Sequence, residues 1–252
     1  MGDLGERAAI VTGGAQGIGR HFAHALARAG AAVAIFDLED ASAAARAIAE
    51  DTGARCISVT GDVSNEGDVA RAVEAVIAAF GRIDILVNNA AYMSAVPIVP
   101  HAELTVETWD RVMAVNLRGP FLMVKHVTPH MTRAGYGKII NIGSATANKG
   151  VPNLLAYVTS KGGILGFTRA LSREVGAGGI CVNTLSPGLI ESDGTLANPQ
   201  HLAHQDRVIS TRAIQRVEVP DDLVGALLFL AGPQSDFMTG QTLVVDGGSA
   251  NV

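Results

Sequence analysis

Short apolar runs recur along the whole chain, and a segment with helical periodicity follows most of them. Runs without polar alternation are typical of strands that are buried on both faces of a sheet. The runs cover residues 8–12, 32–36, 55–59, 83–87, 137–142, 180–185 and 242–245. Helices are expected at 17–28, 41–51, 66–80, 106–132, 155–175 and 221–230, the fourth of them bent near Gly119-Pro120. This alternation predicts an α/β fold with a parallel sheet between two layers of helices.

The composition narrows the classes of protein that the chain can represent. It has 252 residues, of which 48% are hydrophobic, and a formal net charge of -5. No linker, repeat or low-complexity segment interrupts the pattern, so we expect a single domain over residues 1–252. Charged residues make up 17% and form no blocks, which disfavours nucleic-acid binding. Apolar runs fall short of the ~20 residues of a membrane span and the first residues do not resemble a signal peptide, so we expect no membrane association and a cytoplasmic location.

Cysteine and histidine residues give no indication of a metal site. Cys56 and Cys181 each lie in an apolar run and are expected to be small buried residues of a reducing compartment. The histidines are scattered without the spacing of zinc ligands, and His201 and His204 are expected in a solvated loop. We therefore predict that the protein holds no metal.

The stretch between Pro187 and Arg216 lacks strong periodicity. Loops longer than ~15 residues are uncommon in compact domains, and those that occur are usually functional. The sequence therefore predicts a substrate lid at about 188–216.

A glycine-rich turn separates the first apolar run from its helix. It contains Gly13, Gln16, Gly17, Ile18 and Gly19. Glycines permit a tight turn and a close approach of the backbone to a pyrophosphate, while N–H groups at the start of the following helix attract the anion. The spacing Gly-x-x-x-Gly-x-Gly differs from the commoner Gly-x-Gly-x-x-Gly, and taken alone it indicates only a tight turn.

Asp37 gives this turn a cofactor preference. It ends the second strand, where its carboxylate would accept hydrogen bonds from the adenine-ribose hydroxyls and would repel a 2′-phosphate. Leu38 follows it, and no arginine or lysine occurs between Gly13 and Gly19. We therefore predict NAD rather than NADP, although Asp37 alone would fit a solvated strand end.

The next two strands also end in small or polar residues. Asp62 and Val63 follow the third strand, where a side chain and a backbone segment would bracket adenine. Asn89 and Ala90 follow the fourth strand. Parallel sheets bind ligands at this carboxyl edge, so these residues are expected to complete the cofactor site.

Tyr157 and Lys161 stand four residues apart on a predicted helix, so their side chains share one face. The pKa of a tyrosine is ~10, and a neighbouring ammonium together with the positive nicotinamide of NAD would lower it. Ser144 would bind the substrate oxygen, and Asn116 would hold a water that links Lys161 to solvent. The set predicts hydride transfer with Tyr157 as general base or acid. Each residue alone also fits a structural role, as a cap or as half of an amphipathic pair.

These motifs resemble the short-chain dehydrogenase/reductase family over nearly the whole chain, including Pro187-Gly188 and the segment 240–248. The resemblance implies a Rossmann-type, doubly wound sheet of seven parallel strands in the order 3-2-1-4-5-6-7. It also implies that Asn116, Ser144, Tyr157 and Lys161 are catalytic. Under this order Cys56 and Cys181 lie five strand spacings apart, ~24 Å, which is too far for a disulfide.

The resemblance further implies that Pro187, Gly188 and Ile190 line the nicotinamide of the cofactor. Ser192 stands where the family usually has a threonine that contacts the carboxamide, and its hydroxyl would do the same work. Members are commonly homotetramers, so small residues of one helix are expected against another subunit or, alternatively, against their own sheet. These residues are Ala156, Ser160, Gly163 and Ala170.

The expected substrate is a small to medium, neutral, largely apolar alcohol or ketone. The candidate pocket walls at 93–98, 145–146, 151–154 and 189–204 are mainly apolar or small and carry few positive charges. Two other substrates stay open. The segment 187–194 resembles pyridoxal 4-dehydrogenase, which would take a heteroaromatic alcohol or hemiacetal. Reduction of 3-oxoacyl groups on a carrier protein is disfavoured by Asp37 and by the acidity of the chain. A NAD-sensing binding protein is the non-enzyme alternative, although a sensor has no need for Tyr157 and Lys161.

Overall fold

Seven parallel strands form one sheet through the middle of the molecule. The computed structural model describes residues 4–192, 196 and 205–250. The strands are β1 (Ala8–Thr12), β2 (Ala32–Asp37), β3 (Cys56–Thr60), β4 (Ile85–Asn88), β5 (Gly137–Ile142), β6 (Ile180–Pro187) and β7 (Thr242–Val245). Their order in the sheet is β3-β2-β1-β4-β5-β6-β7, which confirms the predicted topology. Because the chain reverses its direction of winding between β1 and β4, the carboxyl edge of the sheet opens there for a ligand.

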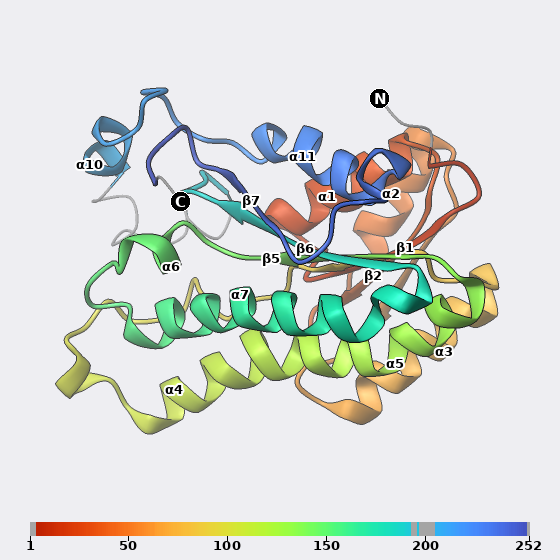
Figure 1. Ribbon diagram of the computed structural model, residues 1–252, viewed down its shortest axis with the longest axis horizontal. Helices are drawn as coiled ribbons and strands as arrows, with labels where there is room; N and C mark the ends of the chain where they lie inside the picture. The colour runs from red at the N-terminus through yellow and green to blue at the C-terminus, as the bar shows by residue number, and fades with distance from the viewer. Residues whose placement is uncertain (1–3, 193–195, 197–204, 251–252) are drawn as a thin grey trace.

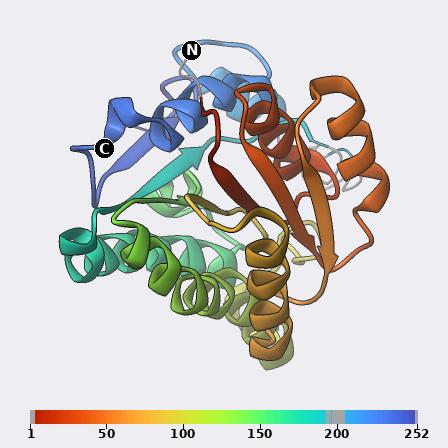
Figure 2. The same cartoon turned by 90° about the vertical axis from the view of Figure 1, so that its right-hand side faces the viewer.

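Helices cover both faces of the sheet, so the molecule has three layers (Figures 1 and 2). One face carries α1 (Gly17–Arg28), α2 (Ser42–Thr52) and α11 (Asp221–Ala231). The other carries α3 (Glu66–Phe80), α4 (Val106–Met113), α5 (Gly119–Ala134) and α7 (Leu155–Val175). Shorter helices lie between these elements, namely α6 (Thr146–Lys149), α10 (Gln205–Ser210) and 3-10 turns at His101–Glu103, Gly176–Gly178 and Pro233–Ser235.

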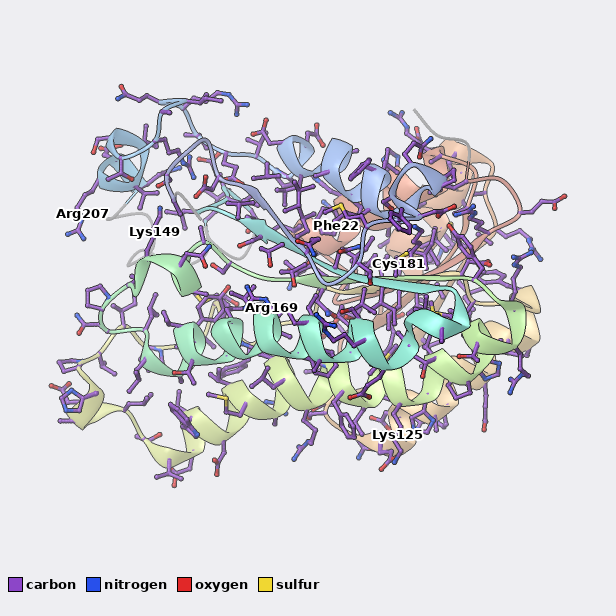
Figure 3. All side chains as sticks on the ribbon, viewed as in Figure 1. Phe22, Lys125, Lys149, Arg169, Cys181 and Arg207 are labelled. Carbon is purple, nitrogen blue, oxygen red and sulfur yellow. The ribbon has the colours of Figure 1, made fainter. Side chains whose placement is uncertain are left out.

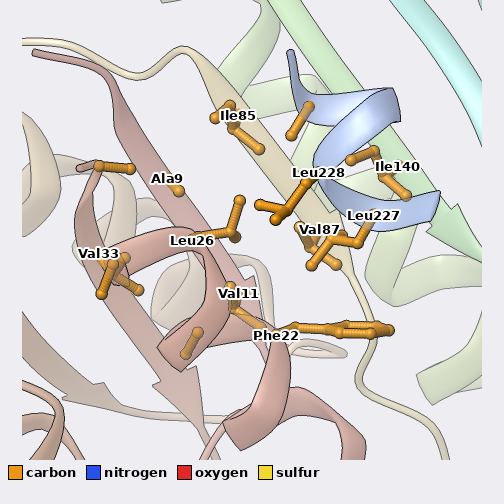
Figure 4. Packing of buried hydrophobic residues seen from close by; sticks show 14 of the residues in the cluster. Ala9, Val11, Phe22, Leu26, Val33, Ile85, Val87, Ile140, Leu227 and Leu228 are labelled. Atoms are coloured by element: carbon orange, nitrogen blue, oxygen red, sulfur yellow. The ribbon is translucent and has the colours of Figure 1, made fainter. Parts of the chain in front are cut away.

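Apolar side chains fix the first helix layer onto the strands that carry the site (Figure 4). The buried cluster on this face includes Phe22 and Leu26 of α1, Leu227 and Leu228 of α11, and Val11, Val87 and Ile140 of the central strands. Burial of one such side chain contributes roughly 1.5–3 kcal/mol. The carboxyl edge of the sheet is therefore held in place by its packing against this helix layer.

The long helix predicted at 106–132 contains a π-helical segment, Ala114–Arg118, between α4 and α5. The backbone stays helical across both of its junctions, so Pro120 follows this segment within one continuous helix. The expected bend near Gly119-Pro120 stays a prediction. The π-helical segment carries Asn116, which is 1% exposed and turned into the protein.

The small residues of α7 differ in burial. Ala156 and Ser160 are buried within the chain, whereas Gly163 is half-buried and Ala170 is exposed. A Cβ added at Gly163 would lie 3.0 Å from the side chain of Leu117 in the π-helical segment, so this glycine packs closely on a neighbouring helix of its own chain. The expected contact with another subunit stays a prediction.

Three further expectations about local structure need correction or completion. Cys56 and Cys181 are free thiols on β3 and β6, five strand spacings apart, but each is half-buried rather than buried. The predicted lid is not irregular throughout, because α10 covers Gln205–Ser210. Residues 193–195 and 197–204 of that lid, His201 and His204 among them, lie outside the described residues. Among the helices that the structure describes, none is long and apolar enough to cross a membrane.

Candidate active site

The hydroxyl of Thr12 ties the glycine turn to the end of β4. Its Oγ1 accepts hydrogen bonds from the backbone N–H groups of Asn89 and Ala90, both at 3.0 Å. The Asn89 amide donates in return to the carbonyl oxygens of Thr12 and Gly13, at 3.0 and 2.9 Å. The Asn89 side chain, predicted to bind the cofactor, therefore also holds the backbone that would cradle it.

Two glycines of the turn are required by close approach. A Cβ on Gly13, whose φ is +68°, would lie 2.8 Å from the Cα of Ala90. A Cβ on Gly19 would lie 2.0 Å from the carbonyl oxygen of Gly13. Gly17 is different, because its φ of +55° favours glycine, whereas a Cβ there would meet, among the described residues, just the Cβ of Ser192 at 4.0 Å. The turn thus lies within van der Waals reach of Ser192 across the sheet edge.

The start of α1 and the end of β2 offer groups that suit a nicotinamide dinucleotide. Gln16, the N-cap of α1, makes no side-chain cap, and the first turn of the helix holds no acidic residue. A helix end of this kind suits an anion such as a pyrophosphate. Asp37 Oδ2 accepts a hydrogen bond from the N–H of Ala15 at 2.8 Å, which places the carboxylate beside the turn. Leu38 is 57% exposed beyond it.

Asp62 and Val63 sit at the same edge but are held more tightly than expected. Asp62 accepts hydrogen bonds from the N–H and hydroxyl of Ser64, both at 2.7 Å, and from Arg111 at 3.0 Å. Burial favours a raised pKa for Asp62, but these hydrogen bonds outweigh it and lower the pKa. The Val63 side chain is buried against Gly119. Only the backbone of Val63 is thus left to contact an adenine.

A cavity of about 280 Å³ brings together the other predicted residues. Those among its lining residues are Ile18, Asn89, Ser144, Tyr157, Lys161, Pro187, Gly188, Ile190 and Ser192. The remaining predicted residues do not line this cavity, namely Gly13, Gln16, Gly17, Gly19, Asp37, Leu38, Asp62, Val63, Ala90 and Asn116. The cavity is therefore the reaction end of the site, and the glycine turn forms the other end of the same sheet edge.

Lys161 reaches Tyr157 from within the same helix. Its Nζ lies 5.7 Å from the centre of the Tyr157 ring and donates a hydrogen bond to the carbonyl oxygen of Ile142 at 2.7 Å. Burial lowers the pKa of Lys161 to about 8. Burial also raises the pKa of Tyr157 to about 12, which hydrogen bonding with Ser144 offsets only in part. Burial therefore raises the pKa of Tyr157, whereas the neighbouring lysine was expected to lower it.

Asn116 contributes by bracing the catalytic helix. Its Oδ1 accepts a hydrogen bond from the N–H of Tyr92 at 2.7 Å, and its Nδ2 donates to Ser160 Oγ at 3.0 Å. Ser160 in turn donates to the carbonyl oxygen of Tyr157 at 2.7 Å. These contacts fix the helical turn that carries Tyr157, while the predicted water link between Asn116 and Lys161 stays a prediction.

Five residues of the cavity wall stand outside the walls and site residues that the sequence predicted, namely Ala91, Ile142, Gly143, Lys149 and Val208. Lys149 ends the short helix α6, five residues after Ser144, and its Nζ donates to the hydroxyl of Ser249. Figure 3 shows Lys149 at the end of the molecule where α6 and α10 lie. Without a prediction of α6, no signal in the sequence indicated which way this lysine points. The pocket therefore has a cation on its wall that the prediction of an apolar lining did not include.

Comparison with known proteins identifies the family. A family model described as enoyl-(acyl carrier protein) reductase matches residues 13–250. A short-chain dehydrogenase/reductase of Hericium erinaceus is 38% identical over 250 residues, which are 97% of this chain and 98% of the relative. The cis-4-hydroxycyclohexanecarboxylate dehydrogenase of Sinomonas cyclohexanicum is 38% identical over 250 residues, 98% of each chain.

Solved structures agree with these relatives. A 3-ketoacyl-(acyl-carrier-protein) reductase from Brucella melitensis, complexed with NADH, superposes with a TM-score of 0.89 at 33% identity, covering 98% of this chain and 100% of that one. A gluconate 5-dehydrogenase from Burkholderia cenocepacia, in complex with NADP and tartrate, gives 0.91 at 36% identity, with 98% and 96% covered. The chain therefore belongs to the short-chain dehydrogenase/reductase family of oxidoreductases.

Proposed function

We propose that the protein is an NAD-dependent oxidoreductase that interconverts an alcohol carbon and the corresponding carbonyl. The observation that carries this proposal is the meeting of Ser144, Tyr157 and Lys161 on one cavity, at the carboxyl edge of a sheet that also carries the glycine turn. A hydroxyl, a phenol and a buried ammonium in one small cavity suit proton transfer to or from a substrate oxygen.

Each of the three residues has a separate task. Ser144 hydrogen-bonds the substrate oxygen and holds it beside the Tyr157 hydroxyl. Because burial keeps the Tyr157 pKa at about 12, this hydroxyl is protonated at neutral pH and gives its proton to the oxygen of a carbonyl. In the oxidative direction Tyr157 takes the alcohol proton, and the Lys161 ammonium stabilises the phenolate before it does so. NAD, when bound, accepts the hydride from the alcohol carbon or, as NADH, returns it.

Asp37 supports NAD as the cofactor. Its carboxylate accepts the Ala15 N–H beside the glycine turn, where a 2′-phosphate would meet a negative charge. The two structural relatives described above carry NADH in one case and NADP in the other, so the family alone does not choose. We also expect a homotetramer in the cytoplasm, which size-exclusion chromatography with light scattering and cell fractionation would test.

The cavity favours a small substrate. Its volume of about 280 Å³ lies just below the usual range for ligand pockets, ~300–1,000 Å³. Met93, Val151 and Leu189 give it apolar walls, in line with a largely apolar, neutral alcohol. Lys149 adds one cation, so a hydroxy acid such as the substrate named for the Sinomonas relative belongs in the same screen.

The experiment is a screen for NAD reduction at alkaline pH with aromatic, alicyclic, pyridoxine-type and carboxylate-bearing alcohols. NADP is included as the alternative acceptor and a 3-oxoacyl thioester as the alternative substrate for the reverse reaction. We expect NADH to form with at least one small alcohol and to form more slowly with NADP. Turnover with the thioester alone would instead favour the alternative function, reduction of 3-oxoacyl groups on a carrier protein. An absence of turnover in all arms would contradict the proposal.

A further inference from the structure

A buried ion pair outside the catalytic set lies directly behind the cavity wall. Arg212 Nη2 and Glu218 Oε2 are 3.0 Å apart, and the two side chains are only 2% and 6% exposed. Taking both charges out of water costs several kcal/mol per ion, so a buried pair is seldom explained by stability alone. We therefore asked which groups Arg212 and Glu218 hold in place.

The pair binds the backbone of four consecutive residues after β6. The Gly188 N–H donates to Glu218 Oε1 at 3.2 Å, and Arg212 Nη2 donates to the carbonyl oxygen of Leu189 at 2.8 Å. The next residue, Ile190, forms an isolated parallel bridge with Glu218, in which the Glu191 N–H donates to the Glu218 carbonyl oxygen at 2.9 Å. The Gly188 N–H is shared with the carbonyl oxygen of Val245 on β7, also at 3.2 Å, so the ion pair fixes the path of residues 188–191 together with the end of the sheet.

Gly188 is shaped to receive the pair. A Cβ at this position would lie 2.4 Å from Glu218 Oε2 and 3.2 Å from Arg212 Nη2. No positive φ requires a glycine there, so the need is for space against the carboxylate. The charges thus rest directly on the backbone of Gly188.

The opposite side of the same backbone faces the reaction. Gly188, Leu189 and Ile190 line the cavity together with Tyr157 and Lys161. We propose that Arg212 and Glu218 are positioning residues that hold this backbone as the wall of the nicotinamide site, so that affinity for NAD depends on their ion pair. The inference rests on the proposed function, because it takes NAD as the ligand of that wall.

The charge of Glu218 makes this dependence sensitive to pH. Burial raises the pKa of Glu218 to about 7, while the Gly188 N–H and Arg212 act in the lowering direction. The other charged groups that act on the pair are Arg216 in the same loop, Asp222 of α11, Asp246 after β7 and Lys149 of α6. As the pH falls through 7, Glu218 takes up a proton and Arg212 loses its charged partner. Affinity for NAD is therefore expected to fall on the acid side of neutrality.

The test measures the dissociation constant of NADH by its fluorescence, at about pH 7.5 and about pH 6. Lys161, with a pKa of about 8, is mainly protonated at both values and does not confuse the comparison. The wild type should bind about tenfold more weakly at the lower pH, as expected when a buried pair loses one charge. E218Q has the shape of the protonated acid, so it should bind at both values as weakly as the wild type does at the lower one. Its KM for NAD should rise about tenfold while kcat changes by less than about twofold, because the Gln alters the wall and not Tyr157.

Two further variants keep the result interpretable. E66Q makes the same substitution in an exposed ion pair with Lys125 on remote helices, so it should leave NADH binding and its pH profile unchanged. If E218Q folds poorly, the double variant R212M/E218L removes both charges and is expected to fold and to bind NADH weakly at both values. Wild-type affinity for NADH in either folded variant would overturn the inference. A wild type that binds no NADH would instead overturn the proposed function.

Discussion

Two glycine-containing turns border the site, and the protein holds them in different ways. The turn after β1 is fixed by neutral groups, through the Thr12 hydroxyl and the amide of Asn89. The turn after β6 is fixed by a buried ion pair whose members, Arg212 and Glu218, lie 23 and 30 residues beyond the backbone that they bind. A neutral network holds the same shape at every physiological pH, whereas a charged one depends on protonation. We therefore expect the adenosine end of the site to be insensitive to pH and the nicotinamide end to respond to it.

The largest effect is expected from a substitution at Tyr157, which lies between the two turns. Tyr157→Phe deletes the hydroxyl that transfers the proton, and general acid–base catalysis of this kind contributes ~10²–10⁴-fold to a rate. We expect kcat to fall about 10³-fold, within that range, and the dissociation constant of NADH to change by less than about twofold. Stopped-flow turnover and NADH fluorescence measure the two quantities. Turnover that survives the substitution would favour a NAD-sensing protein or another proton donor.

A second substitution breaks the neutral turn. A Cβ on Gly19 would lie 2.0 Å from the carbonyl oxygen of Gly13, a backbone atom that cannot move aside without displacing the turn. Gly19→Ala is expected to lower the free energy of unfolding by about 1–3 kcal/mol, as overpacking does, and to weaken NADH binding equally at all pH values. Urea denaturation and NADH titrations at several pH values measure these effects. A loss of affinity confined to acid pH would contradict the assignment of pH sensitivity to the other turn.

The two turns also differ in how well the sequence predicts them. Tyr157 and Lys161 share one helix, and the glycine turn lies within eight residues, so local spacing suffices to find them. Arg212 stands in the predicted lid and Glu218 just beyond its end, where neither periodicity nor spacing relates them to Gly188. Their role depends on how the chain returns to the end of β6, which is a tertiary contact that no local pattern contains.

The sequence also could not predict how deeply Tyr157 and Lys161 are buried. The pairing of Tyr157 with Lys161 was inferred correctly from their spacing, but the direction of the Tyr157 pKa was not. The spacing shows which groups are neighbours, whereas desolvation depends on everything that covers them, and here burial raises the Tyr157 pKa to about 12. The π-helical segment around Asn116 was not predicted either, and the contacts of the Asn116 side chain with Tyr92 and Ser160 are tertiary ones that no local pattern contains.

A smaller effect is expected from the residue that selects the cofactor. Asp37→Ala removes the acceptor of the Ala15 N–H and the charge that would repel a 2′-phosphate. The ratio of kcat/KM for NAD over NADP should fall about tenfold, corresponding to roughly 1.4 kcal/mol. Because Asp37 belongs to the adenosine end, the pH dependence of NADH binding should keep its wild-type shape. An unchanged ratio would show that another group excludes NADP.

The smallest effect should come from an exposed ion pair beside the buried one. Arg216 and Asp222 lie 2.6 Å apart, each four residues beyond a member of the buried pair, with side chains 57% and 22% exposed. Hydrogen bonds from Arg216 and from the Val219 N–H lower the pKa of Asp222 to about 2 from its ordinary value of 3.8. A carboxyl whose pKa is lower in the folded state stabilises the fold above pH 3.8, and that contribution disappears as the pH falls through 2.

Asp222→Asn should therefore lower the free energy of unfolding at neutral pH by less than ~1 kcal/mol, because solvent screens an exposed pair. Urea denaturation should show the difference from the wild type shrinking as the pH is lowered below ~4. At about pH 7.5 the dissociation constant of NADH should stay at its wild-type value, in contrast to E218Q, because Glu218 keeps its charge there when Asp222, which raises its pKa, is removed. Equal losses of affinity in the two variants would mean that the loop as a whole, and not the buried charge on Gly188, sets the wall of the nicotinamide site.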